Sequence, residues 1–282
     1  MNSTKDTILA IDAGNTRVKW GLFNATGSMV ESGACLNSEL AHANLPHALR
    51  IIISNVAGKN IEAQLKSVLP DGMVYWIEAR PKACGVKNGY ESPSTLGSDR
   101  WAALIAAWHL KHAACVVVNA GTAVTVDALS SQQDNTGLFM GGMILPGLNL
   151  MQHSLGIATA QLPKKTSAKR TAAKQAATSL SERNYISADH LVSIFATNTV
   201  DAVYSGALHA ILGAIDLMAQ ALYHHAAIKP HIVISGGNAA IIHQQITQHF
   251  LTSHITNSVI IVDNLVLHGL YLLENSKQSG AL

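Results

Sequence analysis

Short apolar runs, separated by polar turn-forming residues, alternate with segments of helical spacing along this chain. Helical spacing over residues 59–69, 98–112 and 198–227 predicts three helices, the second with Ser98 as its N-cap. Apolar runs of strand length predict strands at 7–12, 17–23, 29–35, 50–58, 73–79, 115–129 (a strand, a turn and a strand), 231–235 and 258–262, the last two each followed by a helix. This order of elements predicts an α/β fold.

The pattern starts again in the middle of the chain. "IDAGNTRVKWGL" at 11–22 matches "VNAGTAVTVDAL" at 118–129, at an offset of about 107 residues. We therefore expect two related halves with a boundary near residue 112, namely 1–112 and 113–282. Within the second half, residues 161–188 are polar and poor in large apolar residues. They are interpreted as a mobile loop or lid over an anionic ligand, or as a solvated surface helix with its linkers.

Composition excludes several classes of partner. The 282 residues are 48% hydrophobic, only 13% charged, and carry a formal net charge of +2. We therefore expect neither nucleic acid nor a membrane surface as partner. The three cysteines have neither metal-ligand nor disulfide-framework spacing, and the N-terminus lacks a secretory pattern, so a cytoplasmic protein with reduced thiols is predicted.

The turn in the first repeat has chemistry suited to phosphate. Gly14 lets backbone N–H groups approach a ligand, Asn15 and Thr16 can donate hydrogen bonds, and Lys19 adds positive charge. Asp12 can hold a hydrated Mg²⁺, which binds one or two carboxylates together with substrate phosphates. An ordinary hairpin would also use Asp and Asn. A glycine pair in "SGGNA" at 235–239 suits a nucleotide base or ribose, although many strand-to-helix turns need glycine.

A second motif, "GYESPSTLGSDRWAAL" at 89–104, supplies groups for an acceptor. Asp99 at a predicted helix start can deprotonate a hydroxyl, and Arg100 can bind a carboxylate through two hydrogen bonds. Favourable placement of an acid in the first helical turn would explain Asp99 alone, but not Arg100. Asp127, in the second repeat, is expected to orient a neighbour or to bind a water of Mg²⁺.

Five motifs in this order resemble type III pantothenate kinases: "DAGNTRVK" (12–19), "YESPSTLGSDRW" (90–101), "NAGTAVTVD" (119–127), "GGMILPGLNLM" (141–151) and "TNTVDAVYSG" (197–206). The resemblance implies two ribonuclease-H-like domains around a central cleft, the fold of the acetate and sugar kinase, Hsp70 and actin superfamily. It implies ATP-dependent phosphorylation of pantothenate to 4′-phosphopantothenate, the first step of coenzyme A biosynthesis, by a homodimer. The alternatives are a kinase for another small hydroxyl compound and a non-catalytic nucleotide-binding regulator.

The resemblance also assigns roles to individual residues. It implies that Asp99 is the general base and that Asp12 lies near Mg²⁺, to which it binds through water. The implied ATP-binding residues are Asp12, Ala13, Gly14, Asn15, Thr16, Arg17, Val18, Lys19 and Thr122. The implied pantothenate-binding residues are Tyr90, Gly97, Ser98, Asp99, Arg100 and Thr199.

One position departs from the family pattern. Asn119 stands where the family usually has an aspartate that helps to bind a monovalent cation, K⁺ or NH₄⁺. Asn keeps a carbonyl oxygen but loses the charge, so weak or absent dependence on that cation is predicted.

Overall fold

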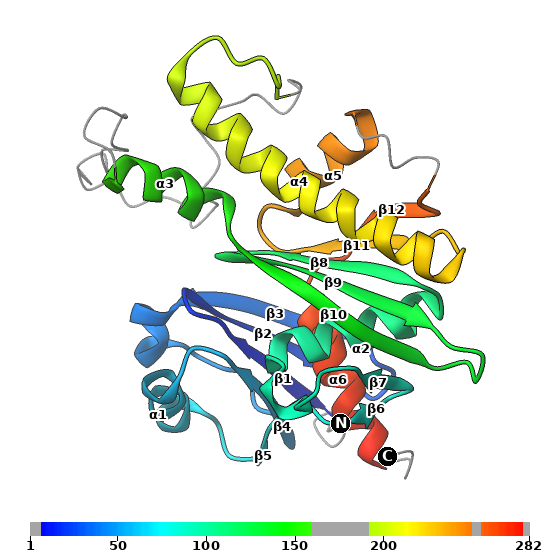
Figure 1. Cartoon of the computed structure of the whole chain (residues 1–282). Helices are drawn as coiled ribbons and strands as arrows, with labels where there is room; N and C mark the ends of the chain where they lie inside the picture. The colour runs from blue at the N-terminus through cyan, green and yellow to red at the C-terminus, as the bar shows by residue number, and fades with distance from the viewer. Residues whose placement is uncertain (1–6, 159–191, 250–254, 279–282) are drawn as a thin grey trace.

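The protein is described by a computed structural model, in which residues 7–158, 192–249 and 255–278 are described. The polar segment 161–188 lies outside them. Twelve strands among these residues form two sheets, one above the other in Figure 1. The first sheet has the strand order β3-β2-β1-β4-β5. Its strands are β1 (Ile8–Ala13), β2 (Arg17–Phe23), β3 (Met29–Leu36), β4 (Arg50–Asn55) and β5 (Met73–Trp76).

The second sheet repeats this arrangement. Its order is β12-β11-β8-β9-β10-β7-β6, and the first five strands in that order correspond one by one to the first sheet read from its other edge. In both sheets three antiparallel strands in succession are followed by two strands that add in parallel on the other side. The five strands are β8 (Cys115–Ala120), β9 (Ala123–Ser131), β10 (Gly137–Pro146), β11 (His231–Ser235) and β12 (Ser258–Ile261). The repeated topology agrees with the repeat in the sequence.

Three elements cross between the halves that the sequence predicts. Two short strands, β6 (Lys82–Ala83) and β7 (Val86–Asn88), precede residue 112 in the chain but join the second sheet, because β7 pairs in parallel with β10. The last described helix, α6 (Leu265–Gln278), packs on β1 and β4 of the first sheet. The boundary at 112–113, which falls between α2 (Ser98–Lys111) and β8, stays a prediction.

A central apolar core lies between the two sheets. It is built by α2 and α6 together with the inner faces of both sheets, and it includes the fully buried Trp101. The two helices touch closely, since a β-carbon at Gly269 would collide with the backbone of Ala102. This shared core holds the two halves, and therefore their turns, in one fixed arrangement.

Helices also cover the outer face of each sheet. The short 3₁₀ helix η1 (Asn37–His42) and α1 (Lys59–Val68) cover the first, while α4 (Thr199–Ala226) and α5 (Ala239–His249) cover the second, with α3 (Leu148–Ala158) beside α4. By length and composition α4 could cross a membrane, and it is the one such helix in the described part of the chain. Its side chains Leu208, Ile211 and Ile215 are buried against the second sheet, as in the core helix of a globular domain.

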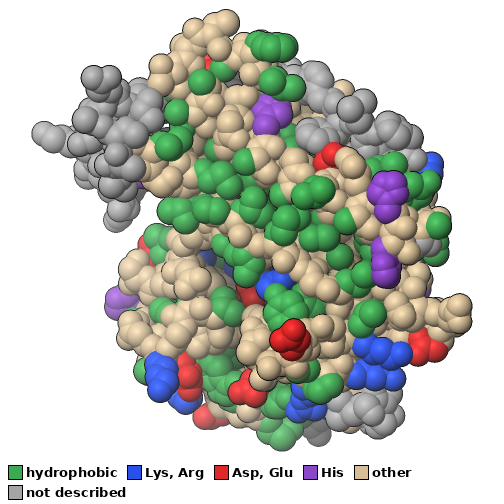
Figure 2. Space-filling model, viewed as in Figure 1, with side chains coloured by type: hydrophobic (Ala, Val, Ile, Leu, Met, Phe, Trp, Pro, Cys, Tyr) green, Lys and Arg blue, Asp and Glu red, His purple; other side chains and the backbone are tan. Residues whose placement is uncertain are grey.

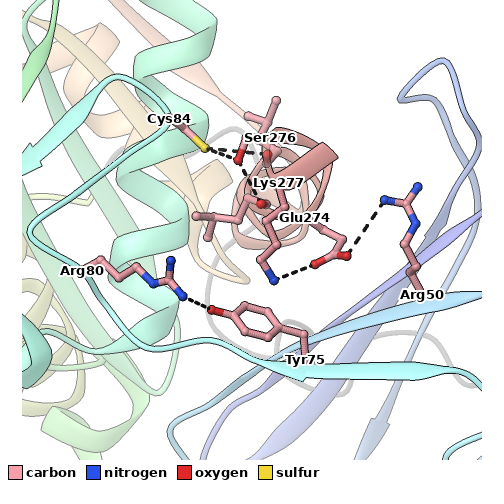
Figure 3. Close-up of polar contacts among 9 residues, drawn as sticks. Arg50, Tyr75, Arg80, Cys84, Glu274, Ser276 and Lys277 are labelled. Atoms are coloured by element: carbon pink, nitrogen blue, oxygen red, sulfur yellow. Dashed lines mark hydrogen bonds and ion pairs between the residues drawn. The ribbon is translucent and has the colours of Figure 1, made fainter. Parts of the chain in front are cut away.

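Polar contacts attach the end of α6 to the first sheet (Figure 3). Glu274 accepts a 3.0 Å hydrogen bond from Lys277 Nζ, and its other oxygen lies 4.0 Å from Nη1 of Arg50 on β4. Lys277 also lies over the ring of Tyr75 on β5. A further contact joins α6 to the second sheet, since the thiol of Cys84, between β6 and β7, lies 3.3 Å from Ser276 Oγ. The C-terminal helix of the second half is thus an integral part of the first.

Candidate active site

The first predicted phosphate turn connects β1 to β2. Asp12 pairs across the strands with Lys19, and the Gly14 N–H donates to the Arg17 carbonyl at 3.1 Å, which closes the turn. Asn15, Thr16 and Arg17 at its tip are exposed. The turn therefore presents backbone, amide and hydroxyl donors to solvent beside a half-buried carboxylate.

Asn37, a residue that the sequence analysis missed, supports this turn. Its Nδ2 donates to the carbonyls of Gly14 and Asn15, at 3.0 Å each. It stands after β3, more than twenty residues away in the chain. Nothing in the local sequence distinguishes it from an ordinary loop asparagine, so only the fold reveals this role.

The second turn, between β8 and β9, faces the first. Thr122 Oγ1 is hydrogen-bonded to Thr16 Oγ1 at 2.9 Å, so the two hydroxyl-bearing turns meet. Gly147, just after β10, lies against the carbonyls of Gly121 and Thr122, where a β-carbon would collide. This places the Pro146–Gly147 segment of the "GGMILPGLNLM" motif against the second turn. On the face shown in Figure 2, the surface is hollowed between the upper and lower halves, and acidic and basic side chains are visible in the hollow.

The glycine pair of "SGGNA" lies at the end of β11 beside the second turn. Gly236 has a φ of +101°, and a β-carbon there would collide with the backbone of Ala120. Asn238 donates its N–H to the Ala120 carbonyl at 3.1 Å. Gly237, in contrast, faces open space. The first glycine is needed for packing, and the second leaves room for a ligand.

Asp99 lies in the first turn of α2. The prediction that Ser98 caps this helix was wrong: the N-cap is Gly97, and Ser98 Oγ instead makes a buried 2.8 Å hydrogen bond with Ser54 Oγ of β4. The Arg100 N–H donates to Asp99 Oδ1 at 2.8 Å. A β-carbon at position 97 would collide with this carboxylate, so glycine there leaves space for the predicted base.

The carboxylates of Asp12 and Asp99 influence each other. Burial and the negative charge of Asp99 raise the pKa of Asp12 to about 7, against the opposing effect of Lys19. Burial likewise raises the pKa of Asp99, although the Arg100 N–H and the Arg100 charge oppose this. Two carboxyl groups with raised pKa values are suited to a site that binds a cation and accepts a proton.

Arg100 is held by Asp127 and Tyr90. Arg100 Nη2 and Nε donate to Asp127 Oδ1 and Oδ2 at 2.5 and 3.2 Å, and Nη1 donates to the Tyr90 hydroxyl at 2.9 Å. The Tyr90 ring packs against Phe139 at a centroid distance of 5.0 Å. Both oxygens of Asp127, for which two roles were expected, thus contact Arg100.

Within one chain, Thr199 does not lie beside Arg100 and its partners Asp127 and Tyr90. It is exposed at the start of α4, which covers one face of the second sheet, while α2 packs on the opposite face. The other predicted site residues lie along the first turn, the second turn and the start of α2, except Tyr90, which follows β7 and reaches Arg100 through its hydroxyl.

A divalent cation fits the donor set, although the described residues contain no group of three or more His, Cys, Asp or Glu that could hold a metal. Mg²⁺ requires less than such a group, because waters and nucleotide phosphates complete its shell. Burial and the neighbouring charge of Asp99 disfavour the ionised form of Asp12. A bound cation would stabilise that ionised form. The site thus fits a cation that arrives with the nucleotide.

The duplicated sheets, the facing hydroxyl-bearing turns and the carboxylate at a nearby helix start agree with the fold expected for the acetate and sugar kinase, Hsp70 and actin superfamily. A structure of a 2-dehydro-3-deoxygalactonokinase, described as putative, from Sinorhizobium meliloti is similar over 96% of this chain and 99% of that one, with 18% identity and a TM-score of 0.49. A sequence model described as type III pantothenate kinase matches residues 8–221. The chain belongs to the type III pantothenate kinase family.

Curated relatives agree with this assignment. The type III pantothenate kinase of Nitrosospira multiformis is 39% identical over 269 residues, which cover 93% of this chain and 89% of the relative. That of Methylobacillus flagellatus is 38% identical over 273 residues, 95% of this chain and 97% of the relative. The similarity covers nearly the whole length of both proteins.

Proposed function

We propose that this protein transfers the γ-phosphoryl group of ATP to the 4′-hydroxyl of pantothenate, the first step towards coenzyme A. The observation that carries the proposal is the contact between the phosphate turn and the start of α2: Ser54, which stands opposite Asp12 in the sheet, is hydrogen-bonded at 2.8 Å to Ser98, the neighbour of Asp99. Donor phosphates and acceptor hydroxyl would thus be brought to one place. Family membership supplies the substrate.

The chemistry follows from the charges of the site. Asp99 accepts the hydroxyl proton as the hydroxyl oxygen bonds to the γ-phosphorus, and the bond between that phosphorus and the β–γ bridging oxygen breaks to release ADP. The raised pKa of Asp99 makes it a stronger base than an exposed carboxylate. Asp12 would hold Mg²⁺ through water, and the bound ion would neutralise charge on the phosphates. The remaining work is the alignment of the two substrates.

The acceptor is bound by the start of α2 and its neighbours. Tyr90 and Arg100 would contact the carboxylate of pantothenate, while Gly97 and Ser98 would shape the pocket beside Asp99. Residues 12–19 and Thr122 would bind the ATP phosphates. The Thr16–Thr122 contact supports this, since both hydroxyls already point to one place.

A homodimer would complete the acceptor pocket. Thr199 lies across the second sheet from Arg100, so a second copy would have to bring it to the pocket. Large apolar side chains are exposed on β10, on α3 and just before α4: Ile144 is 64% and Phe195 87% exposed. Figure 2 shows hydrophobic side chains gathered across the middle of one face. Such a surface is suited to burial against a second copy.

Two further features complete the proposal. Asn119 would weaken or abolish the requirement for a monovalent cation, because its side chain is neutral. We place the enzyme in the cytoplasm, where ATP is supplied, with ATP and pantothenate as its partners rather than nucleic acid or membrane.

A coupled ADP-release assay with Mg-ATP and pantothenate tests the function. Asp99→Asn should lower kcat by about 10²–10⁴-fold, because a positioned general base contributes that much. Asp134→Asn, at an exposed carboxylate paired with Lys87, is the matched control and should keep wild-type turnover.

Absence of pantothenate-dependent turnover in the wild type, with and without K⁺ or NH₄⁺, would overturn the proposal. Turnover with another hydroxyl compound would then indicate a different acceptor. Nucleotide binding without turnover would indicate a regulator.

A further inference from the structure

The contact between Arg100 and Asp127 is geometrically specific. Both oxygens of Asp127 accept from Arg100, one from Nη2 and one from Nε, which is the planar two-bond geometry that suits guanidinium and carboxylate. Burial raises the pKa of Asp127, and this larger effect is opposed by Arg100 and by Thr125, which lies on the same face of β9. Both oxygens of Asp127 are therefore already used in contacts with the protein.

Burial of the Arg100–Asp127 ion pair carries a desolvation penalty. Arg100 is 5% exposed and Asp127 is 1% exposed. A buried ion pair is often no more stabilising than apolar residues of the same volume. Stability alone therefore does not explain why the chain places two charges here.

The neighbouring strand leaves room for the pair. A β-carbon at Gly142 of β10 would collide with Asp127 Oδ1 and with Arg100 Nη2. The rings of Tyr90 and Phe139 flank the guanidinium, each with its centroid 5.6 Å from Arg100 Cζ. The guanidinium is thereby confined on several sides, and its orientation is set by Asp127.

Arg50, a second buried arginine in the described part of the chain, offers a contrast within the same molecule. Arg50 is 8% exposed, yet it meets Glu274 at a single 4.0 Å contact, and its Nη1 has no hydrogen-bond partner. Figure 3 shows this looser pair at the end of α6. The two-bond geometry of Arg100 is thus a property of its site rather than of buried arginines in this chain.

We propose that Asp127 is a positioning residue for the acceptor, acting through Arg100. Of the five N–H groups of Arg100, two donate to Asp127 and one to Tyr90. One N–H remains on each terminal nitrogen, and the Tyr90 hydroxyl, which accepts from Arg100, keeps its own hydrogen. These donors can bind the acceptor's carboxylate. The proposal rests on the proposed function, because that carboxylate belongs to pantothenate.

A cycle of variants tests the role. Asp127→Asn should raise the KM for pantothenate by about 10- to 100-fold, since a small misplacement of a binding group has effects of this size. The KM for ATP should stay near the wild-type value. In Arg100→Gln, the further change Asp127→Asn should add nothing to the KM for pantothenate, because Asp127 acts only through Arg100. This double variant also contains no unpaired buried charge, so it guards against misfolding.

A second test displaces the Arg100–Asp127 pair without removing a charge. Gly142→Ala should also raise the KM for pantothenate, because the added β-carbon would collide with both side chains. Gly213→Ala on α4, where a β-carbon meets nothing within 4 Å, is the matched control. Thermal melts of each variant report folding separately.

The outcomes are distinct. A wild type without pantothenate-dependent turnover overturns the proposed function and this role with it. A wild type with turnover overturns the positioning role alone if Asp127→Asn keeps its KM for pantothenate. The same holds if the two substitutions act additively in the double variant.

Discussion

The two facing turns share a backbone plan but differ in charge. In the first, Asp12 pairs with Lys19 of β2 and stands opposite Ser54 of the parallel strand β4. In the second, Asn119 pairs with Thr125 of β9 and stands opposite Ser235 of β11. The serine on the parallel strand is kept at the matching position, whereas the acid is not.

The two turns share a backbone arrangement, but they differ in the groups that they can offer a ligand. Asp12, Arg17 and Lys19 give the first turn its charges, while the second turn offers the hydroxyl of Thr122. Under the proposed function, neutralisation of phosphate and metal charge would therefore fall to the first turn. The second turn contributes a contact that needs no ion.

Removal of the charge that distinguishes the first turn should have the largest effect. Asp12→Asn is expected to lower kcat by about 10²–10³-fold, the usual cost of losing one preorganised electrostatic group. Without ligands, the same variant should be more stable than the wild type at pH 8. The pKa of Asp12 is about 7 in the folded protein against an ordinary 3.8. Between these values the unfolded chain binds fewer protons, so the free energy of unfolding falls as pH rises.

Thermal melts of wild type and Asp12→Asn at pH 5 and pH 8 measure this second effect. The stability advantage of the variant should be larger at pH 8. An equal advantage at both pH values would contradict the raised pKa, and unchanged kcat would show that the two turns do not differ in the proposed way.

The contact between the turns should have a smaller effect. Thr16→Val and Thr122→Val keep the side-chain shape but remove one hydroxyl each. Each should raise the KM for ATP by about 2- to 12-fold, the equivalent of one hydrogen bond. The effects should not be additive, because the hydroxyls are bonded to each other. Additive effects would indicate that the turns bind phosphate independently.

Restoring an acid to the second turn should have the smallest effect. Asn119→Asp would make the turns alike in charge, and this variant should gain a rate increase with KCl over choline chloride at equal ionic strength. The wild type should respond equally to both salts. A clear potassium response in the wild type would show that the asparagine carbonyl suffices for the cation.

Much of the fold could be predicted from the sequence, because most strands and helices are long and regularly patterned. The two facing turns were predicted from the repeated Gly and hydroxyl residues, and the structure brings them together. The strands β6 and β7 were missed, since two and three residues have no detectable period. Ser98 looked like a cap because serine is the usual residue there, but its partner Ser54 is supplied by another strand.

The parts of the candidate site that escaped prediction depend on long-range contacts. Asn37 supports a turn from another element, and Gly142 looks like an ordinary strand glycine until Asp127 and Arg100 are placed beside it. The partner of a buried charge is fixed by topology rather than by local sequence. Residue types near the turns were therefore predictable, whereas their pairings were not.

The attachment of α6 to the first sheet has a consequence for how the chain folds during synthesis. The apolar inner face of β1 and β4 needs α6 for its cover, yet α6 leaves the ribosome after every other described element. A nascent chain that has completed all five strands of the first sheet still exposes this face. The first half therefore completes its core only after the second has been synthesised, and until then its uncovered apolar face is prone to aggregation.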